Sequence, residues 1–512
     1  MKKLINFIII LIIFSTTSCN KDFLVLYPEG QINEGNFYLT TSDFQQAVVG
    51  AYVPLRDVSL YAFYMEEMRS DNTEYDYYSK DRGGAGYEQL ADFLDVSSNG
   101  VLSSVWLAEY KGIQRTNIIL DRIANINSTV ISDVDKNQII GEAKALRAHY
   151  YFELVRCFGG VPLYLHEVKG NESAFINRSS VDSVYTQIIT DFSDALTLLA
   201  APAKFPQTGR MTKGTVATEL GLVYLTRKDY AKATPLLQSV TQMGYALLPN
   251  YADVFKLANK NSKESIFEVQ FKAGTDGQSS PFIYNFMPTT TNTTNILGVN
   301  YKNTSGGFNV PTNDMVAAYE VGDKRLDASI AVAKGKYNSS VDFIPDSVVS
   351  VLHSSTPGSV SKMFIRKYFN AQAYALVKNT DDNWPLYRYA DVLLMLAESL
   401  NEEAKPAEAL PFLNLVRNRA GLASATSTDQ TALRSIIAHE RRVELAFENH
   451  RWFDLVRTGQ AISVMNAFGV QQKLKYAYLL PASYNVTQNR LIYAIPYRET
   501  QVNLGLKQNP DY

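Results

Sequence analysis

The stretch HERRVELAFENHRWFDLVRTG, His439 to Gly459, concentrates two histidines, four acidic residues and four arginines in 21 positions. This composition is typical of an active site or of a charged scaffold, and the spacing of the residues separates the two. His439 and His450 are eleven positions apart, which corresponds to about 16 Å along a helix. They cannot bind one metal ion within that helix. The stretch also lacks the H-E-x-x-H motif, so the sequence predicts no zinc site here.

Three glutamates of this stretch, Glu440, Glu444 and Glu448, follow one another at intervals of four residues and share one face of a helix. A glycosidase needs two carboxylates about 5–9 Å apart, and this spacing allows such a use. Acids in a row with arginines more often form structural ion pairs with neighbouring helices, here with Arg417 or Arg419. We therefore interpret the stretch as scaffold, with its aromatic tail packed on the core.

Helical periodicity extends over much of the chain. In Ile139–Phe158, apolar residues recur at steps of three and four, and Gly159, Gly160 and Pro162 end the pattern. The same periodicity marks Val181–Leu199, Thr212–Thr226, Tyr230–Gln242, Tyr389–Asn401, Ala407–Ala420 and Gln430–Glu448.

Two of the expected helix pairs repeat one pattern of residues. Five positions recur at intervals of 3, 9, 4 and 3: Gly221, Tyr224, Ala233, Leu237 and Val240 in one pair, and Ala397, Leu400, Ala409, Leu413 and Val416 in the other. Small residues at facing positions let paired helices approach closely, as in tetratricopeptide repeats. We expect a mainly α-helical protein whose tetratricopeptide-like helix pairs, within about 139–245 and 389–455, form a platform.

Two segments, about 69–100 and about 271–380, lack this periodicity. Arg69–Gly86 reads RSDNTEYDYYSKDRGGAG, and Phe271–Val310 is rich in Thr, Asn, Ser and Gly, which predicts loop and short strand. Long irregular segments in a compact protein often bind ligands. We expect them to form a loop-rich ligand-binding face carrying short strands.

The composition excludes several classes of protein. With a net charge of −2 and 46% hydrophobic residues, the chain has no electrostatic footprint for nucleic acid and enough apolar surface for a large core. No G-x-S-x-G elbow, Walker loop, G-x-G-x-x-G or EF-hand calcium loop is present in the sequence. No cofactor or metal is therefore expected.

The N-terminus predicts export. Lys2 and Lys3 precede an apolar run, Leu4–Phe14, that is too short to span a bilayer and ends in the small residues STTSC. We expect residues 1–18 to be a signal peptide and Cys19 to be the lipidated first residue of the mature chain, 19–512. No second hydrophobic run of spanning length follows, so lipid alone would hold the protein at a membrane. Cys157, within a helical pattern, is expected to be a small buried hydrophobe.

The chain resembles the SusD/RagB family of outer-membrane lipoproteins of Bacteroidetes over nearly its whole length. Six motifs carry the resemblance in family order: CNKDFL (19–24), NEGNFYLTTSDFQQAVVGAY (33–52), VWLAEYKGIQRTNIILDRI (105–123), GEAKALRAHYYFELVRCFGGVPL (141–163), NWPLYRYADVLLMLAESLNE (383–402) and ERRVELAFENHRWFDLVRTG (440–459). Trp106, Trp384 and Trp452 lie inside these motifs, so we expect them to be buried.

The resemblance implies a protein without catalytic residues, with four tetratricopeptide-like helix pairs and a loop-rich ligand face. It implies lipid anchoring at the cell surface, where such proteins cap a SusC-like TonB-dependent barrel transporter and pass it oligosaccharides or, in some members, peptides. Sugars need aromatic rings beside amides and carboxylates on loops. The loops supply Asp71, Asn72, Tyr75, Tyr77 and Tyr78, and a second group of Tyr284, Phe286 and Asn292, as candidate ligand-binding residues.

Three functions of different classes stay open. A capture lipoprotein would bind a glycan or a peptide without changing it. A surface glycoside hydrolase would turn its glycan over, because the carboxylates of such enzymes carry little local signature. A tetratricopeptide adaptor would bind only protein.

Overall fold

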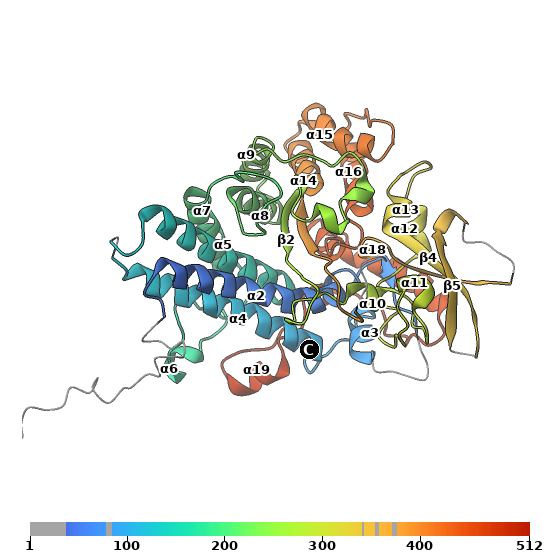
Figure 1. Cartoon of the computed structure of the whole chain (residues 1–512), viewed down its shortest axis with the longest axis horizontal. Helices are drawn as coiled ribbons and strands as arrows, with labels where there is room; N and C mark the ends of the chain where they lie inside the picture. The colour runs from blue at the N-terminus through green and yellow to red at the C-terminus, as the bar shows by residue number, and fades with distance from the viewer. Residues whose placement is uncertain (1–36, 78–83, 128, 340–341, 354–357, 371–375) are drawn as a thin grey trace, which may run out of the picture.

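The computed structural model describes residues 37–512 except 78–83, 128, 340–341, 354–357 and 371–375. Its body is a stack of four helix pairs, each packed against the next (Figure 1). The mainly helical fold class with paired helices is therefore confirmed. The pairs are α2 (Thr41–Glu66) with α4 (Gly100–Ala124), α5 (Asp133–Phe158) with α7 (Val181–Leu198), α8 (Lys213–Thr226) with α9 (Tyr230–Val240), and α14 (Tyr389–Glu402) with α15 (Pro406–Arg419).

Capping residues explain where these helices begin and end. Ser132 starts α5, because its hydroxyl accepts a hydrogen bond from the Asp135 backbone N–H at 3.1 Å. α5 therefore begins at Asp133, six residues before the periodic stretch 139–158 that predicts it. It ends at Phe158, where Gly159 has a φ of 74°, a left-handed conformation that glycine adopts without strain.

The two helix pairs that share the repeated pattern lie side by side, since α9 packs against α14. A β-carbon on Gly221 would lie 2.8 Å from the side chain of Leu237, so glycine is what lets α8 and α9 approach. The hydroxyls of Thr234 on α9 and Ser399 on α14 lie 2.8 Å apart and join the pairs. The structure confirms the tetratricopeptide-like pairing and the role of its small residues.

The segment after the fourth pair holds α16 (Gln430–Glu444), α17 (Arg451–Arg457) and α18 (Ala461–Lys475). α16 ends four residues before the predicted Glu448, because Phe447 and Asn449 both take a φ of 68° and turn the chain into α17. Trp452 on α17 is fully buried, with its ring centroid 5.5 Å from that of Phe93. The aromatic tail therefore packs on the core as predicted.

The glutamates of α16 form ion pairs inside the protein. Arg417 Nη1 lies 2.9 Å from Glu440 Oε2, and Arg419 Nη2 lies 2.5 Å from Glu444 Oε1. Both glutamates are fully buried. The sequence prediction that Arg417 or Arg419 neutralises this row is confirmed for both arginines.

The same network extends to segments far from α16 in the chain. Arg388 Nε lies 2.6 Å from Glu448 Oε2, and its Nη1 lies 2.8 Å from Glu264 Oε1. Lys367 Nζ lies 2.6 Å from Glu448 Oε1, and Arg325 Nη1 lies 3.1 Å from Glu444 Oε2. Every acid of this row thus contacts at least one cation inside the core.

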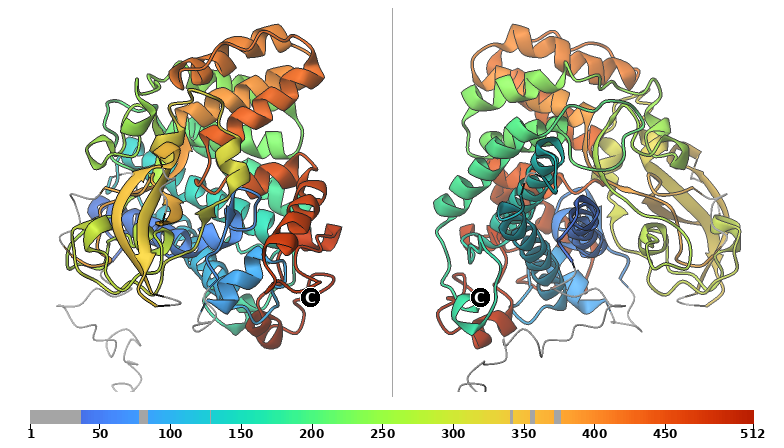
Figure 2. Two further views of the ribbon diagram at one scale, coloured as in Figure 1. Left: turned by 90° about the vertical axis from the view of Figure 1, so that its right-hand side faces the viewer. Right: turned by 60° about the vertical axis from the view of Figure 1, so that its left-hand side comes forward.

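Most of the short strands lie at the other end of the molecule, away from α5 and α7 (Figure 2), whereas β2 (Ser265–Val269) lies beside α8 (Figure 1). They form three small antiparallel sheets, of which β5-β4-β6 is the largest. The strands are β1 (Thr73–Glu74), β2 (Ser265–Val269), β3 (Val310–Pro311), β4 (Ile330–Tyr337), β5 (Phe343–Ser350), β6 (Val360–Ile365) and β7 (Trp384–Arg388), with β1 paired to β3 and β2 to β7.

Short helices lie among these strands. Phe271–Val310, predicted as loop and short strand, also contains two one-turn helices, α10 and α11, because the apolar side chains of α10 are buried. The short helices of this end are α3 (Ala85–Ala91), α10 (Phe282–Phe286), α11 (Thr294–Leu297), α12 (Asn313–Ala317) and α13 (Leu326–Ser329). Two others, α6 (Asn171–Ala174) and α19 (Tyr497–Val502), lie beside α4 instead (Figure 1).

Candidate ligand-binding site

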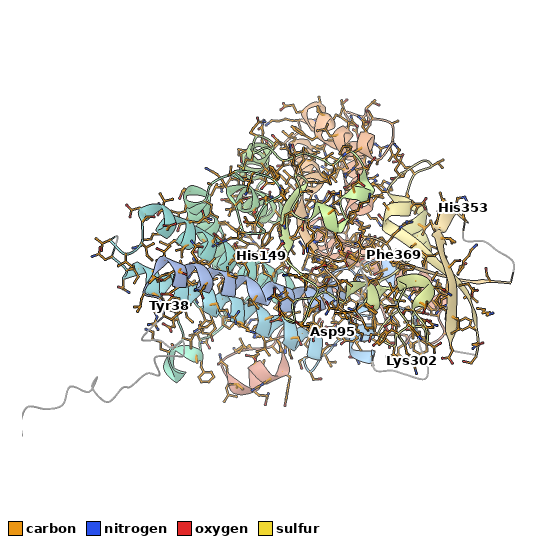
Figure 3. The ribbon with its side chains drawn as sticks, viewed as in Figure 1. Tyr38, Asp95, His149, Lys302, His353 and Phe369 are labelled. Carbon is orange, nitrogen blue, oxygen red and sulfur yellow. The ribbon has the colours of Figure 1, made fainter. Side chains whose placement is uncertain are left out.

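The two predicted binding loops lie next to each other in the structure. β1 pairs with β3, so Thr73 faces Pro311. Beyond the strands, the Asp76 backbone N–H donates to the Gly307 carbonyl at 2.7 Å. In Figure 3, Lys302 marks the lower right of the molecule, where the loop that follows it packs against α3. Residues from two irregular segments more than 200 positions apart therefore build one surface.

Three predicted ligand residues hold this loop in place from the inside. Asp71 accepts hydrogen bonds from Arg451 Nε at 2.8 Å and Nη2 at 2.9 Å. Asn72 accepts a hydrogen bond from Arg442 Nε at 2.9 Å, and the Tyr75 hydroxyl donates to Asp92 Oδ2 at 3.0 Å. All three are at most 5% exposed. All three side chains are held by partners within the protein, and their contact with a ligand stays a prediction.

The second predicted group also lies largely inside. Tyr284 and Phe286 are fully buried, and Phe286 packs edge-on against Phe63 with ring centroids 5.0 Å apart. Asn292 is half-buried, and its Oδ1 accepts a hydrogen bond from the Thr294 backbone N–H at 2.8 Å, which starts α11. A polar, glycine-rich sequence predicted exposure here, but the aromatic rings fill the space between the loop and the helices.

Tyr77 is the predicted residue that the structure places at the surface of this region. Its half-buried ring stacks on Tyr478, with centroids 3.9 Å apart and an angle of 12° between the planes. Tyr476 continues the group, 5.2 Å from Tyr478. We call Tyr77, Tyr476 and Tyr478 the tyrosine face. Tyr78 and Cys19, also singled out from the sequence, lie outside the described residues.

Polar groups surround the tyrosine face. Glu74 accepts a hydrogen bond from Lys475 Nζ at 2.8 Å and from the Tyr476 hydroxyl at 2.8 Å. Burial, and next the charge of Glu74, raise the pKa of Tyr476 well above its usual range. Asp76 is exposed and pairs with Lys362. The Tyr476 phenol therefore stays a protonated donor, and carboxylates and ammonium groups lie at the edges of the tyrosine face.

A second group of rings lies beside the tyrosine face on α3. Tyr87 is half-buried and stacks on Tyr64, with centroids 4.0 Å apart and 12° between the planes. Phe308 meets Tyr87 edge-on at 5.3 Å. A β-carbon on Gly84 would lie 2.9 Å from Phe308, so glycine is needed where α3 begins. The hydrogen bond between Asp76 and Gly307, which precede Tyr77 and Phe308 in the chain, links the two groups of rings.

The sequence carries a signal for this site that the loop composition hides. The segments EYDY (74–77) and KYAY (475–478) have the same Tyr-x-Tyr spacing. The first begins with the acidic Glu74 and the second with the basic Lys475. In the structure the two charges pair and rings from the two segments stack. Tyr476, Tyr478, Tyr87 and Phe308 were not predicted, because only the fold brings them beside Tyr77.

The surface has the chemistry of a binding site. Rings with polar edges suit a ligand that has both C–H faces and hydroxyls. Within the described ranges, no group of three or more His, Cys, Asp or Glu side chains is placed to hold a metal ion. None of the helices described is both long and apolar enough to cross a membrane.

Two family models match this chain and together span most of it. The model described as SusD family matches residues 263–512, and the SusD-like model described as starch-binding associating with outer membrane matches residues 37–225. The chain belongs to the SusD family. The resemblance expected from the sequence motifs is thereby confirmed.

Individual SusD relatives match over nearly the full length. A SusD-like protein of Formosa agariphila is 29% identical over 98% of this chain and 97% of its own. One of Bacteroides ovatus is 25% identical over 87% of this chain and 82% of its own. A solved laminarin-binding SusD-like protein is 26% identical, with a TM-score of 0.74 over 92% of this chain and 100% of its own. The stacked helix pairs are thus the SusD architecture.

Proposed function

We propose that this protein captures oligosaccharides at the cell surface without catalysis and passes them to a SusC-like TonB-dependent transporter in the outer membrane. The observation that carries the proposal is the tyrosine face, in which stacked phenol rings meet charged side chains. Membership of the SusD family and the likeness to a laminarin-binding structure support it. The anchor would be lipid on Cys19.

The physical argument is that a sugar ring has two kinds of surface. Its C–H groups pack on aromatic faces, and its hydroxyls hydrogen-bond to carboxylates, amides and phenols. Tyr77 and Tyr478 supply the rings, while Glu74, Asp76 and Lys475 lie at their edges. Because the rings already stack on each other, the platform is formed before the ligand arrives, which lowers the entropy cost of binding.

Titration of laminarin oligosaccharides into the purified protein tests the site. Tyr478→Ala should weaken binding about tenfold, since losing aromatic contacts worth about 1.5 kcal/mol corresponds to that factor. The matched control is Tyr497→Ala, which removes an exposed tyrosine from α19 and should leave binding unchanged. Equal affinity of Tyr478→Ala and the wild type would exclude the tyrosine face, provided both melt at the same temperature.

Two further measurements separate the competing functions. Long incubation with a bound glycan should yield no new reducing ends, and a yield that disappears on removing one carboxylate would favour a hydrolase. If a panel of polysaccharides gives no binding and peptides do bind, the captured ligand is a peptide. Affinity purification of the full chain from membranes tests the transporter, and Cys19→Ala tests the lipid anchor.

A further inference from the structure

A cavity of about 430 Å³ lies between the helix pairs, apart from the tyrosine face. It is walled by α14, α16, α17 and the turn between α8 and α9, and includes residues of the stretch 439–459. Its volume lies within the range of small-molecule sites in proteins. No residue of the tyrosine face lines it.

The acids that line this cavity are already neutralised by arginines. Glu398 Oε2 accepts a hydrogen bond from Arg457 Nη2 at 2.8 Å, and Glu402 Oε2 accepts one from Arg434 Nη2 at 2.9 Å. Asp454, the third acid of the wall, pairs with Arg457 and Arg441 on α17 and α16. The wall therefore offers few unpaired carboxylates to a ligand.

Hydrogen-bond donors are in excess on the same wall. Arg442 and Arg451 bind Asp71 and its neighbours through Nε and Nη2, and no described residue accepts from their Nη1 groups. Their side chains keep 14% and 15% exposure. Lys228, at the rim, is exposed and has no carboxylate within 4 Å in the described part of the chain. These unpaired donors suit a ligand that carries an anionic group able to accept hydrogen bonds.

Apolar side chains complete the wall. Leu225, Ile437, Leu455 and Val464 face the cavity together with the half-buried ring of Tyr230. A bare inorganic anion would leave this apolar area without a contact. A ligand with a carboxylate at one end and a carbon skeleton at the other would use both kinds of wall.

We propose that this cavity is a second binding site, for a small carboxylate-bearing ligand the size of one or two sugar rings or amino acids. The Nη1 groups of Arg442 and Arg451 would each donate to a carboxylate oxygen, and Lys228 adds an uncompensated charge at the entrance. The carboxylate belongs to a uronic acid or to the end of a short peptide, and this assignment is independent of the glycan site proposed above.

Calorimetric titration with matched probes tests the cavity. Digalacturonate is compared with the neutral digalactoside, and the dipeptide Ala-Ala with its C-terminal amide. We expect one acidic probe to bind at least tenfold more tightly than its neutral partner, and the pair that shows the difference identifies the source. Lys228→Gln should weaken binding of that probe about fivefold, and Lys232→Gln, on α9 and outside the cavity, should not.

The outcomes that overturn the proposal are equally specific. If neither acidic probe binds at 10 mM, a site with a dissociation constant of about 10 mM or tighter is excluded. Equal effects of Lys228→Gln and Lys232→Gln would place binding elsewhere, as would loss of acidic-probe binding in Tyr478→Ala. Because both lysines are exposed, neither substitution removes a core contact, and a melting curve of each variant checks that the protein is folded.

Discussion

At the scale of the residue, Glu444 explains why the charged stretch is scaffold. Its carboxylate contacts Arg419 at 2.5 Å, Arg388 at 2.9 Å and Arg325 at 3.1 Å, from three separate segments. Burial favours the neutral acid, but these three arginines overcome it and hold the pKa of Glu444 far below its usual range. One buried acid thus holds together parts of the chain that are distant in sequence.

Glu444→Ala should therefore destabilise the protein without changing its ligand affinity. Removing one partner from a buried ion pair leaves uncompensated charge, which costs about 3–5 kcal/mol. Thermal melts and laminarin titration of the surviving folded fraction measure the two effects. Glu408→Ala, at an exposed acid on α15, is the matched control and should change stability by less than about 0.5 kcal/mol. A stable Glu444→Ala protein that binds no ligand would reverse the interpretation.

The same acids predict how stability depends on pH. Against the cost of burial, Arg441 and Arg457 hold the pKa of Asp454 far below its usual range, as the arginines do for Glu444. The unfolded chain binds more protons than the folded one below about pH 4.3, so the stabilisation is complete above that pH and falls as acid is added. The melting temperature should drop steeply between about pH 4 and pH 2. In Glu444→Ala the decline should be shallower, and an equal slope would contradict this assignment.

At the scale of the element, close contacts between helices depend on glycines, which have no side chain. A β-carbon on Gly112 of α4 would lie 2.2 Å from the ring of Tyr150 on α5. That ring cannot move aside freely, because its hydroxyl donates to the Ala51 carbonyl at 2.7 Å and the side chain is fully buried. A β-carbon on Gly50 of α2, in contrast, would have no neighbouring atom within 4 Å.

Gly112→Ala and Gly50→Ala should have opposite effects on stability. The first substitution overpacks a helix interface and should cost about 1–3 kcal/mol, whereas the second improves helix propensity by up to about 1 kcal/mol. Chemical denaturation of both variants measures the difference. If Gly112→Ala were as stable as the wild type, α4 and α5 would not pack as described.

At the scale of the whole molecule, the two halves matched by the family models share one hydrophobic core, so we expect them to fold as one unit. α14, in the second half, packs on α8 and α9, in the first. The tyrosine face also needs both halves, because Tyr77 stacks on Tyr478 and Glu74 pairs with Lys475. Neither half has a complete core or a complete site.

Expression of residues 37–262 and 263–512 as separate chains tests this view. Each fragment exposes the apolar surface that α9 and α14 bury together, so neither should show a cooperative thermal transition. Co-expression of the two fragments should restore both the transition and laminarin binding. Cooperative melting of the fragment 263–512 alone would show that the halves are independent domains.

The sequence by itself determined several of the helices and two of the helix pairs, but its periodicity did not predict the pair of α2 and α4. The apolar period places α5 from residue 139 onward, the repeated small residues pair α8 with α9 and α14 with α15, and the charge row of α16 predicts its arginines. These features depend on residues within a few turns or on a pattern that one element carries. These features of the scaffold can therefore be predicted without knowing how the rest of the chain folds.

The tertiary structure alone decided which aromatic residues face solvent. Tyr75 and Tyr77 have the same sequence surroundings, yet Tyr75 is 4% exposed and bonds to Asp92, while Tyr77 stacks at the surface. Tyr478, which is 401 positions from Tyr77, packs against both rings, and the fold also brings Asp92 to the Tyr75 hydroxyl. Local composition cannot report such a contact, because exposure depends on which distant segment packs on each side of the chain.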